Sequence, residues 1–318
     1  MRRVRLGARG PEVSRLCFGT LTMGPLQRDM SPQDGAALLC YAANRGIDFV
    51  DTAEIYGTYP HIALALRRHP QLKVCTKTYA CDAAEAAKSL ALAQQGIGRA
   101  YIDVFMLHEQ ESEHTLRGHE EALRYLAEKK REGLVGAIGI STHHVAAVRA
   151  AIRFGRNWGG LDVVHPIFNR KGLGVVDGTR ADMEEACAQA KAHGMGVLAM
   201  KPLGGGHLIG APQSAFGYVL THPAVDAVAV GMQSTAEIDY NLAVFEGCAP
   251  AKDTRRICAR APRRAMVHDW CAGCAACVQR CDQQAIAVRE GRAHIDAARC
   301  VRCGYCATVC PQFCIKII

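Results

Sequence analysis

The chain has 318 residues, enough for one large domain alone or with a small second domain. Its composition is that of an ordinary soluble protein, and no apolar run approaches the ~18 residues that a membrane span needs. The net charge of +8 is not accompanied by a nucleic-acid-binding motif, so we expect neither a nucleic acid nor a membrane as a partner. Residues 1–7 are basic without an apolar core behind them, which predicts no secretion signal and a cytoplasmic location.

Strand-like and helix-like segments alternate from the N-terminus to about residue 245. Residues 4–14 predict a two-stranded hairpin that turns at residues 8–10. Mostly apolar runs then predict parallel strands buried on both faces, at residues 15–18, 49–50, 72–76, 101–107, 135–140, 163–165, 196–200 and 225–230. Amphipathic runs between them predict helices at residues 32–45, 61–68, 83–95, 116–131, 144–154, 180–193, 213–221 and 235–245.

Eight strand–helix units in about 230 residues are the number found in a TIM barrel. The predicted fold class is therefore α/β, a (β/α)8 barrel over residues 1–247 whose floor the N-terminal hairpin would cover. A doubly wound open sheet is the alternative, but no G-x-G-x-x-G motif follows the first strand. Residues 248–268 are rich in Arg, Ala and Pro and predict a linker or extended arm, and residues 269–318 predict a small second domain.

Three neighbouring strands are followed by residues capable of acid–base chemistry: Asp51, Lys77 and His108 end the second, third and fourth strands. Tyr56 lies on the loop after the second strand, and in a TIM barrel such strand ends face the substrate. Each residue alone has a structural interpretation, for example Asp51 as a helix cap. Together they form a coherent device, because an ammonium lowers the pKa of a nearby phenol and a buried ammonium needs a carboxylate partner.

These four residues match a tetrad of the aldo-keto reductase superfamily in residue type, order and approximate spacing. Residues 1 to about 247 therefore resemble that superfamily. The resemblance implies a TIM barrel with the catalytic tetrad Asp51, Tyr56, Lys77 and His108. It further implies hydride transfer from a nicotinamide to a carbonyl carbon while Tyr56 protonates the oxygen, or the reverse oxidation of an alcohol. His108 would orient the substrate oxygen, and the substrate would be a small carbonyl compound or alcohol.

The same resemblance implies nucleotide-binding positions. Ser141 and His165 would hold the nicotinamide carboxamide, and Lys201 with the glycines from Gly204 to Gly206 would approach the pyrophosphate, although a flexible loop is the alternative. The full predicted set is Ser141, His165, Lys201, Leu203, Gly204, Gly231, Glu237 and Asn241. NADP-dependent relatives carry Lys and Arg at the positions of Gly231 and Glu237. Because a carboxylate would repel a phosphate, NAD(H) is favoured over NADP(H).

Nine of the sixteen cysteines lie between Cys271 and Cys314, which in a cytosolic chain indicates metal or cluster binding rather than disulfides. Two C-x2-C-x2-C-x3-C sets follow each other. Each cysteine of the second set lies 29 residues after its equivalent in the first, as Cys300 does after Cys271. The pattern resembles bacterial two-cluster ferredoxins, in which the fourth cysteine of each set ligates the other cluster. It implies one [4Fe-4S] cluster on Cys271, Cys274, Cys277 and Cys310, and a second on Cys300, Cys303, Cys306 and Cys281.

Two four-cysteine zinc sites are the alternative interpretation of these sets. Cys314 is left over and receives no role. Between the two sets, residues 285–288 and 293–295 flank Glu290-Gly291 and predict a β-hairpin, so the second domain is expected to be a small α+β, ferredoxin-like iron–sulfur domain.

Three hypotheses connect the two halves. A nicotinamide moves two electrons as hydride, whereas iron–sulfur clusters move one at a time, and a flavin usually mediates between them. No flavin signature is present, but a TIM barrel can bind a flavin without a short motif. The first hypothesis is an aldo-keto reductase-like enzyme whose clusters exchange electrons with a redox partner protein or a further cofactor. The second is carbonyl chemistry with structural or regulatory clusters. The third is an electron-transfer subunit whose barrel serves as a docking module.

Overall fold

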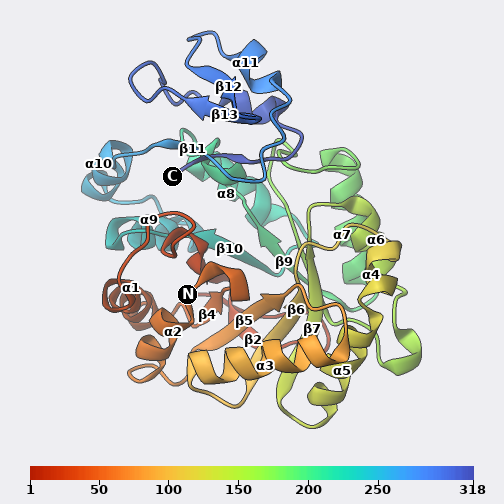
Figure 1. The fold of residues 1–318 in the computed structure, drawn as a ribbon. Coiled ribbons are helices and arrows are strands. Elements are labelled where there is room, and N and C mark those ends of the chain that lie inside the picture. Colours follow the sequence, from red (N-terminus) through yellow and green to blue (C-terminus); the bar gives the residue numbers. More distant parts are fainter.

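Eight parallel strands close into a barrel in the computed structural model, which describes residues 1–318 (Figure 1). The strands follow the chain around the barrel, and β10 closes it by pairing with β3. They are β3 (Leu16–Gly19), β4 (Phe49–Asp51), β5 (Lys73–Thr78), β6 (Ile102–Leu107), β7 (Val135–Thr142), β8 (Val163–Pro166), β9 (Gly196–Met200) and β10 (Ala227–Gly231). The predicted (β/α)8 fold is confirmed.

Nine helices of the barrel region cover the outside of the strands (Figure 1). They are α1 (Pro32–Asn44), α2 (Tyr59–Leu66), α3 (Ala83–Ile97), α4 (Glu113–Gly118), α5 (Glu120–Arg131), α6 (Val145–Ala151), α7 (Arg180–Ala192), α8 (Pro212–Thr221) and α9 (Thr235–Phe245). The side chains of Ser31, Asp82 and Thr179 cap the starts of α1, α3 and α7 by accepting a backbone N–H.

The prediction of one helix over residues 116–131 was wrong, because two helices occupy this region. His119 separates α4 from α5 and has a non-helical φ of −112°. Its ring Nδ1 lies 2.7 Å from the carbonyl oxygen of Thr115. This local side-chain-to-backbone bond competes with continuation of the helix.

The predicted N-terminal hairpin is confirmed as β1 (Arg3–Arg5) paired antiparallel with β2 (Glu12–Ser14). Leu6 and Val13 from this hairpin are fully buried and belong to the same apolar cluster as inward-facing strand residues such as Phe49 and Val104. Gly7 lies against the start of β9, where a Cβ would collide with the backbone of Gly196. The hairpin therefore closes the N-terminal end of the barrel.

Residues 248–268, expected to be a linker or arm, contain α10 (Lys252–Arg260) and β11 (Ala265–Val267). β11 pairs antiparallel with β14 (Ile315–Ile317), so the last strand of the chain returns to the arm. The rest of the C-terminal unit consists of α11 (Ala276–Arg280), the 3-10 helix η5 (Tyr305–Val309) and the hairpin of β12 (Ile286–Arg289) and β13 (Arg292–Ile295). That hairpin confirms the predicted one.

The C-terminal unit packs on the end of the barrel where the strands finish (Figure 1). Phe313 is only 2% exposed and belongs to the main apolar cluster of the barrel. Its ring centroid lies 5.9 Å from that of His143, which follows β7. β14 packs against the 3-10 helix η4 (Gly204–Gly206), and the ring Nε2 of His207 lies 3.0 Å from the carbonyl oxygen of Ile315. No helix has the length and apolar character needed to cross a membrane.

The contact between η4 and the last strand predicts the effect of Gly206→Ala. Gly206 has a φ of +94°, and a Cβ there would collide with the carbonyl oxygen of Ile317. We expect a cost of about 1 kcal/mol or more and faster hydrogen exchange of the amides of β14, measured by mass spectrometry. Gly210→Ala is the matched control, because nothing lies within 4 Å of its Cβ position. Equal exchange in both variants would contradict the contact.

Candidate active site and cysteine pockets

A buried ion pair joins the ends of β4 and β5. Lys77 Nζ lies 2.6 Å from Asp51 Oδ1 and 2.8 Å from the carbonyl oxygen of Thr52. Burial alone would raise the pKa of Asp51, but Lys77 and His165 hold it well below its ordinary value. Burial alone would lower the pKa of Lys77, but Asp51 raises it above its ordinary value. Both groups are therefore charged at neutral pH.

Tyr56 and His108 complete the set of four that the sequence predicted. Tyr56 belongs to the 3-10 helix η2 (Glu54–Tyr56) after β4, and its hydroxyl lies 3.4 Å from Nε2 of His108. Lys77 Nζ lies 5.3 Å from the centre of the Tyr56 ring. The fold thus brings Asp51, Tyr56, Lys77 and His108 together at the C-terminal end of the barrel.

The pKa of the Tyr56 phenol is raised, whereas the sequence led us to expect that Lys77 would lower it. Burial raises the pKa of Tyr56 to about 12, and Lys77 offsets this only in part. The physical reason is that removing the phenol from water disfavours its charged form by more than the ammonium, which also hydrogen-bonds to Asp51 and Thr52, favours it. Tyr56 is therefore a protonated phenol at neutral pH, which is the form that a proton donor needs.

His108 is held neutral by burial and by Lys77, which place its pKa well below the ordinary value. Its Nδ1 has no hydrogen-bond partner. The sequence did not identify Tyr79, whose ring stacks on His108 with centroids 4.7 Å apart and whose hydroxyl donates to Glu109 at 2.6 Å. The position of Tyr79, two residues after Lys77 past the end of β5, was the only signal that could have suggested it.

Two predicted carboxamide contacts have protein partners near the tetrad. His165 Nε2 lies 3.7 Å from Asp51 Oδ1, and its Nδ1 donates to the carbonyl oxygen of Leu198 at 2.5 Å. Ser141 Oγ accepts a hydrogen bond from the backbone N–H of Glu109 at 2.9 Å. Both side chains are buried, so any further contact to a nucleotide would be made beside the tetrad.

The predicted pyrophosphate turn lies against the end of this chain. Lys201 has a φ of +55°, its Nζ lies 2.6 Å from Nε2 of His143, and burial lowers its pKa to about 8. Leu203 precedes η4 and Gly204 is buried at its start. A Cβ at Gly205 would contact Lys316 and Phe313. The close approach that the glycines allow is thus made by the C-terminal segment.

Glu237 lies in the first turn of α9, whose N-cap is Ser234. Its backbone N–H donates to Ser234 Oγ at 3.2 Å, and its Oε2 accepts from the backbone N–H of Gln233 at 2.9 Å. Its Oε1 lies 3.5 Å from the guanidinium of Arg263, which the arm brings from outside the barrel. The carboxylate expected to repel a 2′-phosphate therefore has a cationic neighbour. Gly231 ends β10 on the surface and Asn241 is buried in α9.

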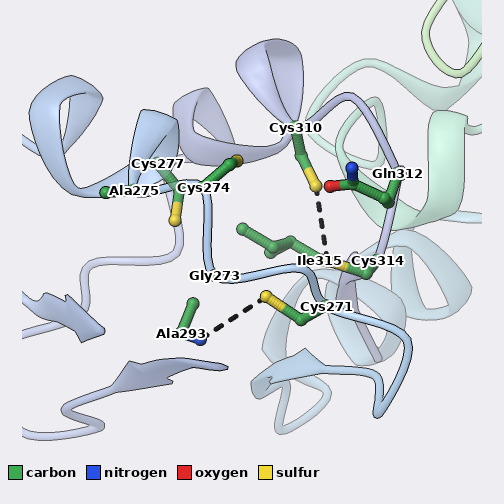
Figure 2. Close-up of a pocket in the computed structure, with 10 residues that line it drawn as sticks. All are labelled: Cys271, Gly273, Cys274, Ala275, Cys277, Ala293, Cys310, Gln312, Cys314 and Ile315. Carbon is green, nitrogen blue, oxygen red and sulfur yellow. Dashed lines mark hydrogen bonds between the residues drawn. The ribbon is translucent and has the colours of Figure 1, made fainter. Parts of the chain in front are cut away.

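Cysteines of the C-terminal unit line two separate pockets. The first is lined by residues that include Cys271, Cys274, Cys277, Cys310 and Cys314 (Figure 2). The second is lined by residues that include Cys281, Cys300, Cys303 and Cys306. In each pocket the fourth cysteine of one set joins the first three of the other, as in the ligand sets that the ferredoxin resemblance implies. The sulfurs surround a pocket rather than converging on the position of a single metal ion.

Backbone donors point at some of these sulfurs. The N–H of Ala293 donates to Cys271 Sγ at 3.4 Å, and that of Ala285 donates to Cys281 Sγ at 3.3 Å. Burial alone would raise the pKa of Cys271, but the N–H groups of Ala293 and Gly273 bring it below the ordinary value. The thiolate is the form that ligates metal, and these N–H groups favour it at Cys271, whereas burial raises the pKa of Cys277 in the same pocket. Ligation by the eight cysteines stays a prediction.

The buried ion pair predicts the effect of Lys77→Met. Removing Lys77 leaves Asp51 buried without its partner, which should cost about 3–5 kcal/mol in the free energy of unfolding. The wild-type pair stabilises the fold fully above about pH 4, the ordinary Asp range, and its contribution is lost as the pH falls through the lowered pKa of Asp51. Urea denaturation at pH 3 and pH 7 should therefore show a smaller pH dependence in the variant.

Lys73→Met is the matched control on the same strand. Lys73 Nζ is partly exposed at 3.4 Å from Asp48, and Arg3 still pairs with that carboxylate at 2.6 Å when Lys73 is removed. We expect a cost of about 0–1 kcal/mol. A loss as large as that of Lys77→Met would contradict a special role for the buried pair.

Comparison with sequence families matches residues 15–214 to the aldo/keto reductase family and residues 293–316 to a 4Fe-4S binding domain. The Glycine max protein named probable aldo-keto reductase 1 is 27% identical over 217 residues, which are 64% of this chain and 60% of that protein. The chain thus spans 60% of that relative's length. One component of an ion-translocating oxidoreductase complex from Methanosarcina acetivorans is 39% identical over 54 residues, which are 17% of this chain and 20% of that protein.

Solved structures share the barrel. A Pseudomonas aeruginosa protein assigned to the aldo-keto reductases matches with a TM-score of 0.65 and 25% identity, over 77% of this chain and 94% of that one. An aldo-keto reductase from Bacillus halodurans matches with the same TM-score and 18% identity, over 82% of this chain and 96% of that one, which supports the fold. The chain belongs to the aldo/keto reductase family and carries a 4Fe-4S binding domain at its C-terminal end.

Proposed function

We propose that the chain is an oxidoreductase that reduces a small carbonyl compound, or oxidises the corresponding alcohol, by nicotinamide hydride transfer. The observation that carries the proposal is the meeting of Asp51, Tyr56, Lys77 and His108 at the end of the barrel where substrates of this fold bind. Membership of the aldo/keto reductase family supports the same reaction class. The substrate class follows from the chemistry of this tetrad.

Each member of the tetrad has a role in proton transfer. Tyr56 is protonated at neutral pH and donates its phenolic proton to the substrate oxygen during reduction. Lys77 stabilises the phenolate that remains, and Asp51 keeps Lys77 charged inside the barrel. His108 is neutral and beside Tyr56, so it can orient the same oxygen by a hydrogen bond. A bound nicotinamide supplies the hydride.

The residues that would hold the nucleotide are those of the predicted set near the tetrad, Ser141 and His165, together with Lys201, Leu203, Gly204, Gly231, Glu237 and Asn241. NAD(H) stays the predicted preference, but its charge argument is weakened. The negative charge of Glu237 is offset by Arg263 at 3.5 Å. A flavin is a further candidate for the same barrel end.

We further propose that the two cysteine pockets hold two [4Fe-4S] clusters. The 4Fe-4S domain match and the division of the cysteines between the pockets support this. Bound clusters supply one-electron exchange. Phe313 N–H donates to the carbonyl oxygen of Cys310 at 3.1 Å, while its ring packs in the barrel core, so the first pocket and the barrel share one short segment. A redox partner protein would exchange electrons with the unit.

The second candidate function is an electron-transfer protein whose barrel serves as a docking module. The contact of β14 with the turn from Gly204 to Gly206 favours it, since that turn was expected to hold pyrophosphate. The intact tetrad favours the reductase. The two candidates differ in whether Tyr56 is needed for turnover, which the next experiment tests.

Tyr56→Phe should lower carbonyl reduction by NADH or NADPH by about 10²–10⁴-fold under anaerobic conditions, because it removes the proton donor. The iron content and the electron paramagnetic resonance spectrum should stay unchanged. Tyr59→Phe is the control, since Tyr59 is a buried neighbour whose hydroxyl bonds to Thr76 at 2.8 Å. It should keep most of the activity. Wild-type activity in Tyr56→Phe would favour the docking-module function.

Arg263→Ala should weaken use of NADPH if the adenosine ribose lies at Glu237. The uncompensated carboxylate would repel a 2′-phosphate by about 1 kcal/mol, which is about fivefold in KM for NADPH with little change for NADH. Glu237→Gln should shift the KM for NADPH the opposite way. Arg264→Ala is the control, because Arg264 donates to the carbonyl oxygen of Gln27 instead. Unchanged KM values in all three would place the ribose elsewhere.

A further inference from the structure

Cys314 is the one cysteine of residues 269–318 outside the two predicted ligand sets, and it lies in the first pocket (Figure 2). It is 1% exposed. Its Sγ lies 3.3 Å from Cys310 Sγ, and Cys271 lines the same pocket. A buried thiol therefore lies beside a sulfur that is predicted to ligate the first cluster.

The 29-residue repeat of the cysteine sets provides an internal comparison. The residue of the second pocket equivalent to Cys314 is Ala285, and both are followed by a buried isoleucine. The backbone N–H of Ala285 donates to Cys281, the fourth cysteine of its set. In the first pocket the corresponding sulfur, that of Cys310, has the Cys314 thiol as its partner. The equivalent positions Ala285 and Cys314 thus each contact the sulfur of the fourth cysteine of their set, but only Cys314 offers a side-chain donor.

We infer that Cys314 is a positioning residue that donates an S–H···S hydrogen bond to Cys310 and thereby raises the reduction potential of the first cluster above that of the second. The inference rests on the proposed binding of clusters. Reduction adds one electron to the cluster and breaks no bond. The added negative charge spreads over the ligand sulfurs, so a donor to those sulfurs stabilises the reduced state more than the oxidised state.

The first pocket lies next to the barrel, so the proposed difference between the two reduction potentials bears on the barrel site. Three residues after Cys310 the chain reaches Phe313, which packs against the barrel near His143 and Lys201. A higher potential would make the first cluster the one that retains an electron shared between the two. The electron would then rest on the cluster whose ligand segment enters the barrel end.

The test compares Cys314→Ala with Cys314→Ser in the full chain, using potentiometric titration followed by electron paramagnetic resonance. Alanine copies the equivalent residue Ala285 and removes the donor, so the first cluster should become about tenfold harder to reduce, a shift of about 59 mV for one electron. Serine keeps a donor and should shift the potential less. Iron content should equal that of the wild type in both. Cys274→Ser, which alters one predicted ligand, assigns the signal of the first cluster.

Ala285→Cys is an independent variant that places a thiol in the second pocket and should raise the potential of the second cluster. An unchanged potential in Cys314→Ala with full iron content would overturn the inference. Loss of about half the iron in that variant would also overturn it, because Cys314 would then be a ligand. If Cys314→Ala does not fold, an unshifted second cluster in Ala285→Cys would overturn it. A wild-type chain that binds no cluster would instead refute the proposed function.

Discussion

The buried pair of Lys77 and Asp51 is the interaction on which the barrel site depends. Two charges inside an apolar barrel carry a large desolvation cost, which only a close contact and further hydrogen bonds offset. Parallel pairing of β4 with β5 supplies that contact, since Asp51 lies opposite Cys75, two residues before Lys77. Within this pair, Lys77 donates hydrogen bonds to Asp51 and to the carbonyl oxygen of Thr52. Desolvation outweighs the effect of Lys77 on Tyr56, so the phenol is protonated rather than ionised.

The C-terminal unit changes the surroundings of this site without contributing to the tetrad. Its last strand lies on η4, its Phe313 packs in the barrel core, and its arm places Arg263 beside Glu237. Two lysines lie at the same junction: the buried Lys316 is over the Phe313 ring at 3.2 Å, and the partly buried Lys201 is on the barrel side at 5.6 Å. Residues predicted to bind a nucleotide thus share one region with the segment that leaves the first cysteine pocket.

Sequence reasoning succeeded where the signal was local or strictly spaced. The strand count, both hairpins and the meeting of Asp51, Tyr56, Lys77 and His108 followed from short patterns and from the rule that parallel strands end at one edge. It missed contacts between distant segments. His165 against Asp51 and Arg263 against Glu237 join residues that share no motif. The break at His119 was missed because an amphipathic pattern does not report a side chain that bonds to its own helix.

By itself, the sequence determined the fold class, the family resemblance and the division of eight cysteines into two repeating sets. Each of these features follows from the periodicity or the spacing of residues along the chain. Only the tertiary structure decided the charge state of Tyr56, the partner of Glu237, the covering of the glycine turn and the placement of Cys314 beside Cys310. The physical reason is that burial and electrostatic balance depend on every neighbour in space. The neighbours that matter here lie far apart along the chain, in the barrel strands and in the final strand.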